Sequence, residues 1–173
     1  MVDIKMIVAV DEEWGIGKDG GMLVHLPSDL RYFREKTLGG VCLMGRRTLE
    51  SLSHGKGLAG RVNIVISKTM SAADAEKKDC YLAESVEKAL SLLDSNDVMV
   101  NDKSKIFVIG GGQLYAGMLP YASAVLVTKI SGVHEADTFF PNLDEDENFY
   151  EADSGEPLEE NGISFSFCEY KRK

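Results

Sequence analysis

A run of apolar residues passes directly into three glycines in the stretch Ile106-Phe-Val-Ile-Gly-Gly-Gly-Gln-Leu-Tyr115. The apolar part has no polar break and is rich in β-branched residues, which predicts a strand buried on both faces. The glycines predict a tight turn whose peptide N–H groups lie against a flat ring or a phosphate, and a helix beginning at Gln113 adds a partial positive charge. A turn that needs only positive φ explains the same residues, and both interpretations stay open.

The length and composition are those of a soluble globular protein. With 173 residues, 44% hydrophobic and 27% charged, we expect a single domain over residues 1–173 with its own core. The apolar runs are shorter than the ~20 residues that cross a bilayer, and the first residues lack the pattern of a signal peptide, so we expect the cytoplasm and no membrane partner. We also expect a monomer.

The net charge bears on the possible partners. A charge of −9 argues against nucleic acid, because neutralisation of phosphates supplies most of the affinity for DNA or RNA. An anionic ligand of this acidic chain must therefore meet a local basic patch.

The cysteines and histidines indicate neither a disulfide framework nor a metal site. Cys42, Cys80 and Cys168 are odd in number, far apart and set among apolar residues, so we expect them to be small core residues. The three histidines are isolated from one another and from any cysteine pair. This spacing does not suit metal ligands, and we expect no metal.

A second buried strand, Lys5-Met-Ile-Val-Ala-Val10, leads into a glycine-rich segment. There, Gly15, Gly17 and Gly20 spell G-x-G-x-x-G after a strand. The dinucleotide fingerprint requires a helix to begin at the motif, whereas this sequence continues to Pro27 without a helical period, so we reject that interpretation. We expect a long loop of the type that closes over a pocket.

A helix is predicted over residues 27–39, with Pro and Ser at its start and Gly at its end. Asp29 lies one position before Leu30, at the edge of the inward face that Leu30 shares with Phe33. A carboxylate there is either an exposed first-turn residue that stabilises the helix dipole or a buried functional group. The residues alone leave both interpretations open.

Two adjacent arginines follow a short strand and a glycine in Val41-Cys-Leu-Met-Gly-Arg-Arg-Thr48. The start of a helix repels cations, so Arg46 and Arg47 indicate an anion nearby. With Thr48 and the helix N–H groups they would form a phosphate cradle, and a solvated basic helix start is the alternative. The later Gly55-Lys-Gly57 does not fit G-x-x-x-x-G-K-[ST], which excludes a P-loop.

The remaining chain predicts further strands and helices and a terminal hairpin. We expect strands at residues 63–68, 80–82 and 124–130, helices at 84–93 and 113–119, a loosely helical segment at 69–78, and a solvated acidic tract at 144–147. Residues 149–153 and 163–170 alternate apolar with polar side chains, which predicts an antiparallel hairpin with a longer loop around residues 159–162.

Six blocks in sequence resemble the dihydrofolate reductase family, and they cover nearly the whole chain. They are Ile7-Val-Ala-Val10 with Gly15-Ile-Gly17, Leu26-Pro-Ser-Asp-Leu-Arg-Tyr-Phe33, Met44-Gly-Arg-Arg-Thr48, Gly60-Arg-Val-Asn63, Ile109-Gly-Gly-Gly-Gln-Leu-Tyr115 and Asp137-Thr-Phe-Phe-Pro141. One block is a weak signal, whereas six in the family's order are specific. The resemblance implies an α/β fold: a mixed, mostly parallel eight-stranded sheet with flanking helices and a C-terminal antiparallel hairpin.

The resemblance also implies an activity, hydride transfer from NADPH to C6 of 7,8-dihydrofolate with protonation at N5. The product, 5,6,7,8-tetrahydrofolate, supplies one-carbon and thymidylate metabolism. Asp29 resembles the family's only ionisable group in the pterin pocket, Thr128 would brace it by a hydrogen bond, and Arg61 would bind the α-carboxylate of the glutamate tail. The apolar walls would come from Ile7, Ala9, Leu30, Phe33, Leu52, Leu58 and Ile109.

For the cofactor, the resemblance implies residues from several turns. Arg46, Arg47 and Thr48 would hold phosphates, and Ser67 with Lys68 would bind the adenosine 2′-phosphate that distinguishes NADPH from NADH. A cis peptide is implied at Gly110-Gly111. The full expected set is Ala9, Ile16, Gly17, Gly45, Arg46, Arg47, Thr48, Ser67, Lys68, Ile109, Gly110, Gly111, Gly112, Gln113, Leu114 and Tyr115.

The sequence departs from the family pattern in the loop before the Asp29 helix. The family usually reads Leu-Pro-Trp where this chain has Met22-Leu-Val24, and Leu49 replaces a usual aromatic residue. These changes bear on catalytic rate, loop closure and antifolate affinity rather than on the fold. The expected catalytic set is Asp29, Thr128, Tyr115 and Met22.

Two alternatives to this activity remain. One is an NADPH-dependent reductase of another pterin-like or riboflavin-pathway substrate on a similar scaffold, against which the Leu-Pro-Ser-Asp setting of Asp29 argues. The other is a catalytically weak folate- or nucleotide-binding module, motivated by Val24 in place of the family's Trp.

Overall fold

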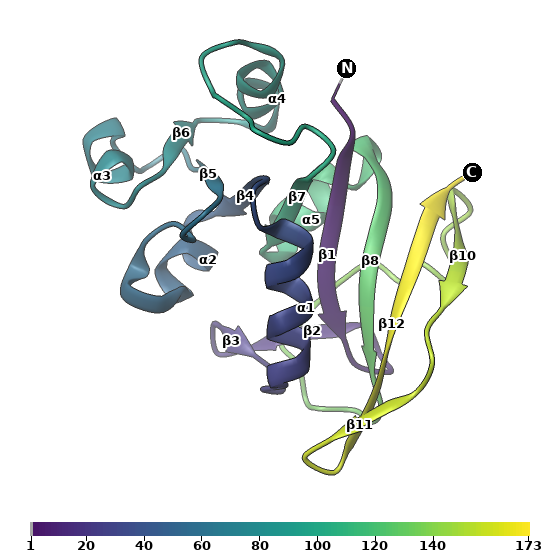
Figure 1. Ribbon diagram of the computed structural model, residues 1–173. Coiled ribbons are helices and arrows are strands. Elements are labelled where there is room, and N and C mark those ends of the chain that lie inside the picture. Colours follow the sequence, from purple (N-terminus) through teal and green to yellow (C-terminus); the bar gives the residue numbers. More distant parts are fainter. Residues whose placement is uncertain (1) are drawn as a thin grey trace.

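A large mixed sheet forms the centre of the computed structural model, which describes residues 2–173 (Figure 1). Its strands are β1 (Ile4–Val10), β4 (Val41–Gly45), β5 (Val62–Ile66), β6 (Tyr81–Ala83), β7 (Ile106–Gly110), β8 (Ala122–Ile130), β10 (Phe149–Ser154), β11 (Leu158–Glu160) and β12 (Ile163–Arg172). Eight of them follow the order β10-β12-β8-β1-β7-β4-β5-β6, and β11 pairs with β12. Pairs between β8 and β6 along this order are parallel, whereas β12 is antiparallel to β8 and β10. The expected mixed, mostly parallel sheet is confirmed.

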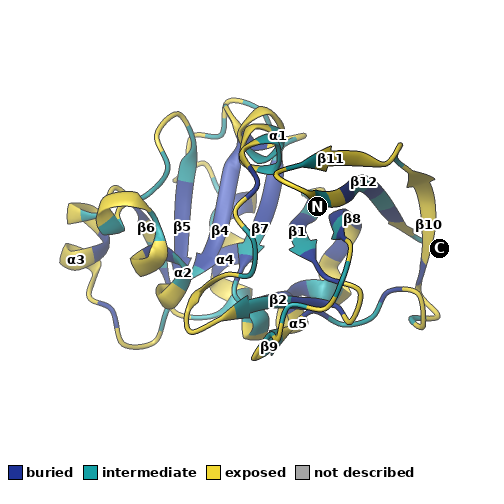
Figure 2. Cartoon of the chain, turned by 90° about the horizontal axis from the view of Figure 1, so that it is seen from below, coloured by how far each residue is buried: buried dark blue, intermediate teal, exposed yellow. Residues whose placement is uncertain are grey.

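The central strands are apolar throughout because both of their faces are covered. Along β7, Ile106 and Val108 belong to the main core, whereas Phe107 and Ile109 pack on the opposite face beside Phe33. This alternation of neighbouring residues between two apolar layers explains why the strand sequence has no polar break. The strands β4, β5 and β7 are accordingly buried in Figure 2, whereas the arm formed by β10 and β11 is exposed.

Helices cover both faces of this sheet. They are α1 (Pro27–Thr37), α2 (Arg46–Ser51), α3 (Ala72–Lys77), α4 (Val86–Asp94) and α5 (Gly112–Met118), with the 3-10 turns η1 (Ser53–Gly55) and η2 (Leu119–Tyr121). The hydroxyls of Ser71 and Ser85 cap α3 and α4 by accepting backbone N–H groups three residues later, which fixes where these helices begin. The expected helices are therefore present, with α4 starting two residues later than predicted.

The glycine-rich segment after β1 is not the long loop that we expected. It contains β2 (Gly15–Lys18) and β3 (Gly21–Met22), which form a small second sheet with β9 (Thr138–Phe139). Asp19 and Gly20 have φ of 51° and 78° and make the turn between the two strands, a hairpin for which Asp-Gly is a strong local signal. Residues 11–26 contain no helix, in agreement with our rejection of the dinucleotide fingerprint.

The C-terminal hairpin is present, but its loop differs from the prediction. Instead of a longer loop around residues 159–162, β11 pairs with β12 across a tight turn at Asn161 and Gly162, whose φ values are 54° and 77°. Between β10 and β11 the chain passes through Gly155, where a Cβ would lie 2.1 Å from the Phe167 carbonyl oxygen. The close contact with the backbone of β12 thus excludes a side chain at Gly155.

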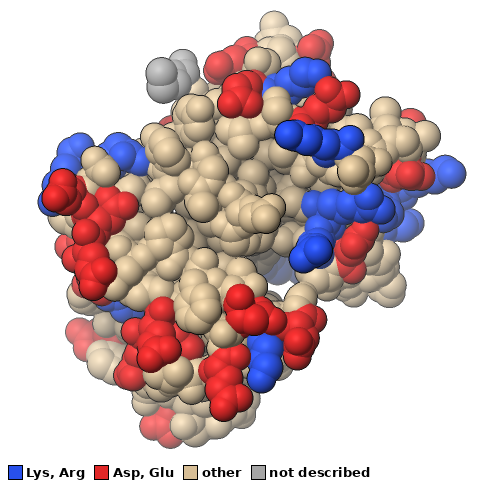
Figure 3. Space-filling view, turned by 180° about the vertical axis from the view of Figure 1, so that it is seen from behind, with Lys and Arg blue, Asp and Glu red and all other residues tan. Residues whose placement is uncertain are grey.

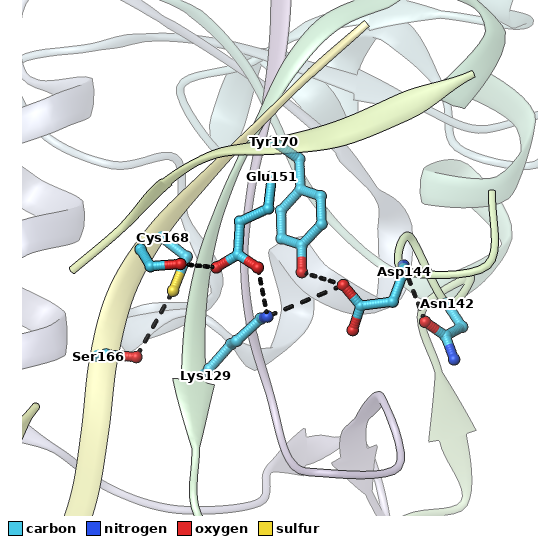
Figure 4. A network of polar contacts seen from close by, with 8 residues as sticks. Lys129, Asn142, Asp144, Glu151, Ser166, Cys168 and Tyr170 are labelled. Carbon is cyan, nitrogen blue, oxygen red and sulfur yellow. Dashed lines mark hydrogen bonds and ion pairs between the residues drawn. The ribbon is translucent and has the colours of Figure 1, made fainter. Parts of the chain in front are cut away.

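A polar network ties the acidic tract to the C-terminal strand (Figure 4). The buried Tyr170 donates a 2.6 Å hydrogen bond to Asp144 Oδ1, and Lys129 Nζ lies 3.3 Å from Glu151 Oε2 and 3.9 Å from Asp144 Oδ1. Burial and the adjacent Asp144 raise the pKa of Tyr170. Asp144, Glu145 and Glu147 are exposed as expected, and the contacts of Asp144 also tie it to β8 and β12.

Two further expectations concerned the position of the cysteines and the presence of a membrane-spanning segment. Cys42, Cys80 and Cys168 are buried free thiols within the core, as predicted. Among the described residues, no helix has the length and apolar character needed to cross a membrane.

Candidate active site

Three turns that the sequence analysis singled out lie at the carboxyl edge of the parallel strands. Strands β7, β4 and β5 lie side by side and end at Gly110, Gly45 and Ile66. The next residues are the glycine turn, the two arginines of α2 and the Ser67-Lys68 pair. Figure 2 shows these strands from the side, with β2 and β9 near the ends that lead into α2 and α5. Open α/β sheets bind ligands at such an edge.

The glycine turn lies against the start of α2. The peptide Gly110-Gly111 is cis, as the resemblance implied, and Gly110 has φ of +137°. A Cβ at Gly110 would lie 3.2 Å from Thr48 Oγ1, and one at Gly112 would lie 2.7 Å from Thr138 Cγ2. Gly110 therefore needs both its backbone conformation and the absence of a side chain, and the contact of this turn with a ring or a phosphate stays a prediction.

Asp29 reaches from α1 toward the strand β8. Its Oδ1 accepts a 2.6 Å hydrogen bond from the hydroxyl of Thr128, a residue only 2% exposed that pairs with Ala9 of β1. Burial raises the pKa of Asp29, and the hydrogen bond from Thr128 opposes that shift. Asp29 is thus a largely buried carboxyl group held by a distant strand rather than an exposed first-turn residue.

An apolar surface adjoins Asp29 between α1 and the sheet. Ile7 is buried with Phe107 and Leu126, and Phe33 and Ile109 pack against them. Ile109 also packs against a second cluster that Leu52 and Leu58 border, so the two clusters form one continuous wall. Ala9 borders a third cluster, whereas Leu30 is 40% exposed and belongs to none of the apolar clusters of the described residues, although we expected it on the inward face of the helix. The structure thus brings most of the expected substrate residues together.

Tyr115 links the glycine turn to this apolar wall. Its ring lies 3.7 Å from the Cβ position of Gly110, and its hydroxyl donates a 2.7 Å hydrogen bond to the carbonyl oxygen of Ile7. Burial and the nearby Asp29 raise the pKa of Tyr115. The phenol therefore stays protonated and holds the backbone of β1 in position, which makes Tyr115 a positioning residue.

Arg61 lies beside the far end of α1. Its guanidinium donates to Ala59 O at 3.0 Å and to Thr37 Oγ1 at 3.2 Å. Burial lowers the pKa of Arg61, and the neighbouring Arg34 lowers it further. Two cations close together favour the binding of an anion at this end of the apolar wall.

The positive charge of the turn after β4 is partly neutralised by an acidic residue of the helix α2 that follows. Arg46 Nε lies 2.9 Å from Glu50 Oε1, and its Nη1 donates to Thr69 Oγ1 at 2.9 Å. Ser67 Oγ in turn accepts the backbone N–H of Thr69 at 3.2 Å. Arg46 therefore joins the start of α2 to the turn after β5, and both belong to the expected phosphate site.

Known proteins that are similar to this chain match it over nearly its whole length. The profile of the family described as "Dihydrofolate reductase" matches residues 3–172. The chain is 36% identical to "Dihydrofolate reductase" of Bacillus subtilis over 98% of this chain and 95% of that protein. The chain belongs to the dihydrofolate reductase family. Staphylococcus haemolyticus has a "Dihydrofolate reductase" that is 33% identical over 98% of this chain and 95% of its own length. The match to the "Bifunctional dihydrofolate reductase-thymidylate synthase" of Glycine max, at 35% identity, covers 97% of this chain and 33% of that protein.

The positions that depart from the dihydrofolate reductase pattern lie in different surroundings. Leu49 is fully buried in the cluster that contains Cys42 and Met44, so the loss of an aromatic ring there is a change within the core. Val24 is half-buried against the cluster of Leu26, Ile130 and Phe165.

The remaining residues that the family likeness singled out lie nearer the surface. Met22 is 60% exposed on β3, opposite Gly17 of β2, so its side chain is not enclosed beside Asp29. Ile16 is half-buried against the main core. Arg47, Lys68 and Gln113 are exposed, and Leu114 is half-buried. The roles of these residues stay predictions.

Asp11 is a residue that sequence reasoning missed. It is 3% exposed, and its two carboxylate oxygens accept the backbone N–H groups of Glu13, Gly15 and His134. It thereby ties the start of the small sheet to the segment before β9. An Asp directly after a buried strand was the available signal.

Asp137 belongs to one of the six blocks that resemble the family, and the resemblance assigned it no role. Its Oδ2 accepts the Asp19 N–H at 2.9 Å, and its own N–H donates to Gly17 O at 2.9 Å. These contacts hold the β2–β3 hairpin beside the carboxyl edge. Within residues 2–173, no group of three or more His, Cys, Asp or Glu side chains is placed to hold a metal ion.

Proposed function

We propose that this protein reduces 7,8-dihydrofolate to 5,6,7,8-tetrahydrofolate with NADPH. The observation that carries the proposal is the Asp29 carboxyl group, which Thr128 holds at 2.6 Å beside an apolar wall. Tyr115 connects this wall to the glycine turn, so a substrate ring on Asp29 and a cofactor ring on the turn would be neighbours. Membership of the dihydrofolate reductase family supports the same activity.

Asp29 acts on the protonation of the substrate. Reduction adds a hydride at C6 and a proton at N5 across one double bond of the pterin. The carboxylate of Asp29 binds the amidine-like edge of the ring and increases the fraction of the cationic, N5-protonated ring, while water delivers the proton. Ile7, Phe33 and Ile109 exclude bulk water, which strengthens this electrostatic effect.

Arg61 fixes the other end of the substrate. Its planar guanidinium matches the geometry of a carboxylate, so it would bind the α-carboxylate of the glutamate tail. The guanidinium of Arg61 donates a 3.2 Å hydrogen bond to the hydroxyl oxygen of Thr37, which orients the side chain of Arg61. Asp29 lies in the first turn of α1 and Arg61 contacts its last residue, so the separation of the two side chains would limit the length of the ligand.

The carboxyl edge fits the cofactor. When bound, the reduced nicotinamide supplies the hydride. A Cβ at Gly110 or Gly112 would meet Thr48 or Thr138, so the turn requires glycine, and its exposed peptide groups would lie against the nicotinamide and the diphosphate. Arg46 and Thr48 would hold phosphates, and Ser67 with Lys68 would bind the adenosine 2′-phosphate. On a chain of net charge −9, this basic group of side chains favours NADPH over NADH.

A purified-enzyme assay tests the proposal. Loss of NADPH absorbance that depends on dihydrofolate, with tetrahydrofolate identified as product, is the expected result. No such loss at high enzyme concentration would exclude the activity. A parallel assay with a riboflavin-pathway substrate separates the alternative on the same scaffold, and Asp29→Asn controls for contaminating reductase.

We also propose that residues 1–173 act as one reductase domain and as a monomer. Size-exclusion chromatography with light scattering tests the second point, because a dimeric mass would contradict it.

A further inference from the structure

A cavity of about 380 Å³ lies between the end of β5 and the start of α4. It is lined by Lys68, from the turn after β5, and by Glu84, Ser85 and Lys88, from the segment that connects β6 to α4. Because β6 is the outermost strand on this side of the sheet, the cavity lies at the end of the row of carboxyl-terminal turns.

The row of turns leads from the cofactor-binding glycines to this cavity. Arg46 donates to Thr69, and Thr69 donates its N–H to Ser67, so the second and third turns of the row are joined. Lys68 belongs both to the third turn and to the cavity wall. A ligand that reaches Ser67 and Lys68 from the glycine turn therefore ends beside α4.

The cavity carries a net positive charge on an acidic protein. Two lysines, Lys68 and Lys88, and one carboxylate, of Glu84, line the cavity, which leaves one positive charge in excess. In Figure 3, Lys and Arg side chains gather on the side of the molecule that carries α3 and β6, with some acidic side chains among them, whereas Asp and Glu dominate the lower part of the view. An anion is the ligand that this local charge favours.

Lys88 is available to such an anion. Its Nζ lies 2.7 Å from Glu84 Oε2, and the two side chains are 64% and 66% exposed. An ion pair this exposed contributes little to stability, so its ammonium group is readily drawn to a more highly charged partner. An adenosine 2′-phosphate carries more negative charge than one carboxylate and offers three acceptor oxygens.

We infer that Lys88 is a second cation for the 2′-phosphate of the cofactor, and that Glu84 opposes this phosphate. The pair would thus set how strongly the enzyme prefers a 2′-phosphorylated dinucleotide. Neither residue belongs to the set that the family resemblance implied. The inference rests on the proposed use of NADPH, because it concerns the adenosine end of that cofactor.

Binding measurements with cofactor fragments test the inference without catalysis. The dissociation constants of 2′,5′-ADP and of 5′-AMP are measured by calorimetry for the full chain. Lys88→Gln is expected to weaken 2′,5′-ADP about five-fold and to leave 5′-AMP unchanged, since only the first ligand has the 2′-phosphate. Glu84→Gln is expected to tighten 2′,5′-ADP about three-fold, because it removes a like charge.

The matched control is Lys103→Gln. Lys103 is exposed in the loop before β7, at the amino edge of the parallel strands, so the same loss of charge there should leave both constants unchanged. An unchanged ratio of the two constants in Lys88→Gln, an equal weakening of both ligands, or weaker 2′,5′-ADP binding in Glu84→Gln would overturn the inference.

One outcome separates this inference from the proposed function. If the wild-type chain binds 2′,5′-ADP no more tightly than 5′-AMP, both the role of Lys88 and the preference for NADPH are wrong. Dihydrofolate-dependent oxidation of NADH by the same preparation would then show that the reductase activity stands without them.

Discussion

The hydroxyl of Thr128 on β8 donates a 2.6 Å hydrogen bond to Oδ1 of Asp29 on α1. The two residues are 99 positions apart in the chain, so the fold alone brings them together. Burial raises the pKa of Asp29, and this hydrogen bond is what opposes the rise. The balance between the two effects decides how much of Asp29 is ionised when the substrate binds.

Thr128→Val is therefore expected to raise the pKa of Asp29 further. The substitution keeps the shape of the buried side chain and removes the donor, which destabilises the ionised carboxylate. Carboxyl carbon shifts followed by NMR across a pH titration measure the change. Thr138→Val is the control, because its hydroxyl bonds to the exposed Asp137 at 3.0 Å instead; a lower Asp29 pKa in Thr128→Val would contradict the assignment.

Asp29→Asn is expected to slow hydride transfer about a hundred-fold or more at neutral pH. An amide does not stabilise the cationic ring, so the rate should recover partly in acid, where N5 is protonated without help. Single-turnover measurements at several pH values, with NADPH binding measured in parallel, test this. A variant that lost cofactor affinity but kept its rate would show that Asp29 serves the cofactor.

The same substitution should change the pH dependence of stability. A raised pKa means that folded Asp29 keeps its proton at pH values where the unfolded chain, with a pKa near 3.8, has released it. Asp29 therefore contributes most to the free energy of unfolding below pH 3.8, and that contribution is lost as pH rises through the folded pKa. Each unit of the rise corresponds to about 1.4 kcal/mol.

Asp29→Asn should accordingly be more stable than the wild-type chain at pH 7. As the pH is lowered, its free energy of unfolding should rise less than that of the wild-type chain. Urea unfolding at pH 3 and at pH 7 gives both free energies. A variant that is less stable at pH 7 would show that the ionised carboxylate is stabilised by the fold.

Arg61→Gln should weaken dihydrofolate binding about ten-fold or more, because a charge-assisted hydrogen bond is lost. The rate at saturation should change little, since the glutamate tail does not react. Steady-state kinetics resolve the two effects. Dihydropteroate, which has no glutamate, serves as the matched ligand. An equal loss of affinity for this ligand would argue that Arg61 only supports the fold.

Gly110→Ala is expected to lower the free energy of unfolding by about 1–3 kcal/mol and to weaken NADPH binding. The added methyl group meets Thr48 Oγ1 at 3.2 Å, and φ of +137° is unfavourable for alanine. Gly117→Ala in α5 is the control, because a Cβ there meets no other atom within 4 Å among the described residues. Gly117→Ala should raise the free energy of unfolding by up to about 1 kcal/mol. Similar effects of both substitutions on cofactor affinity would rule out a special role for the turn.

The parts of the fold that local patterns encode were predictable. The apolar runs of β1 and β7 and the serine-capped helix α4 carry their own signals. The small sheet was not predicted, because β2 pairs with β9 across more than a hundred residues and its Asp19-Gly20 turn lies within a motif that we interpreted as a loop.

The residues of the site also divide into those that local sequence marks and those that only the fold brings together. The sequence marked Asp29 and the glycine turn, but its spacing left the state of Asp29 open until Thr128 was placed beside it. Lys88 had no local signal at all, because its relation to Lys68 arises from the neighbouring positions of β5 and β6.

The buried thiols determine how this enzyme is best labelled. Burial raises the pKa of Cys42 to about 12 and also raises that of Cys80, so thiolate is scarce at neutral pH, and all three sulfur atoms lie inside the core. Maleimide reagents attack the thiolate, and the native chain should therefore react slowly with them. A single cysteine introduced at the tip of the β2–β3 hairpin would then carry a fluorophore selectively and report hairpin movement without prior removal of the natural cysteines.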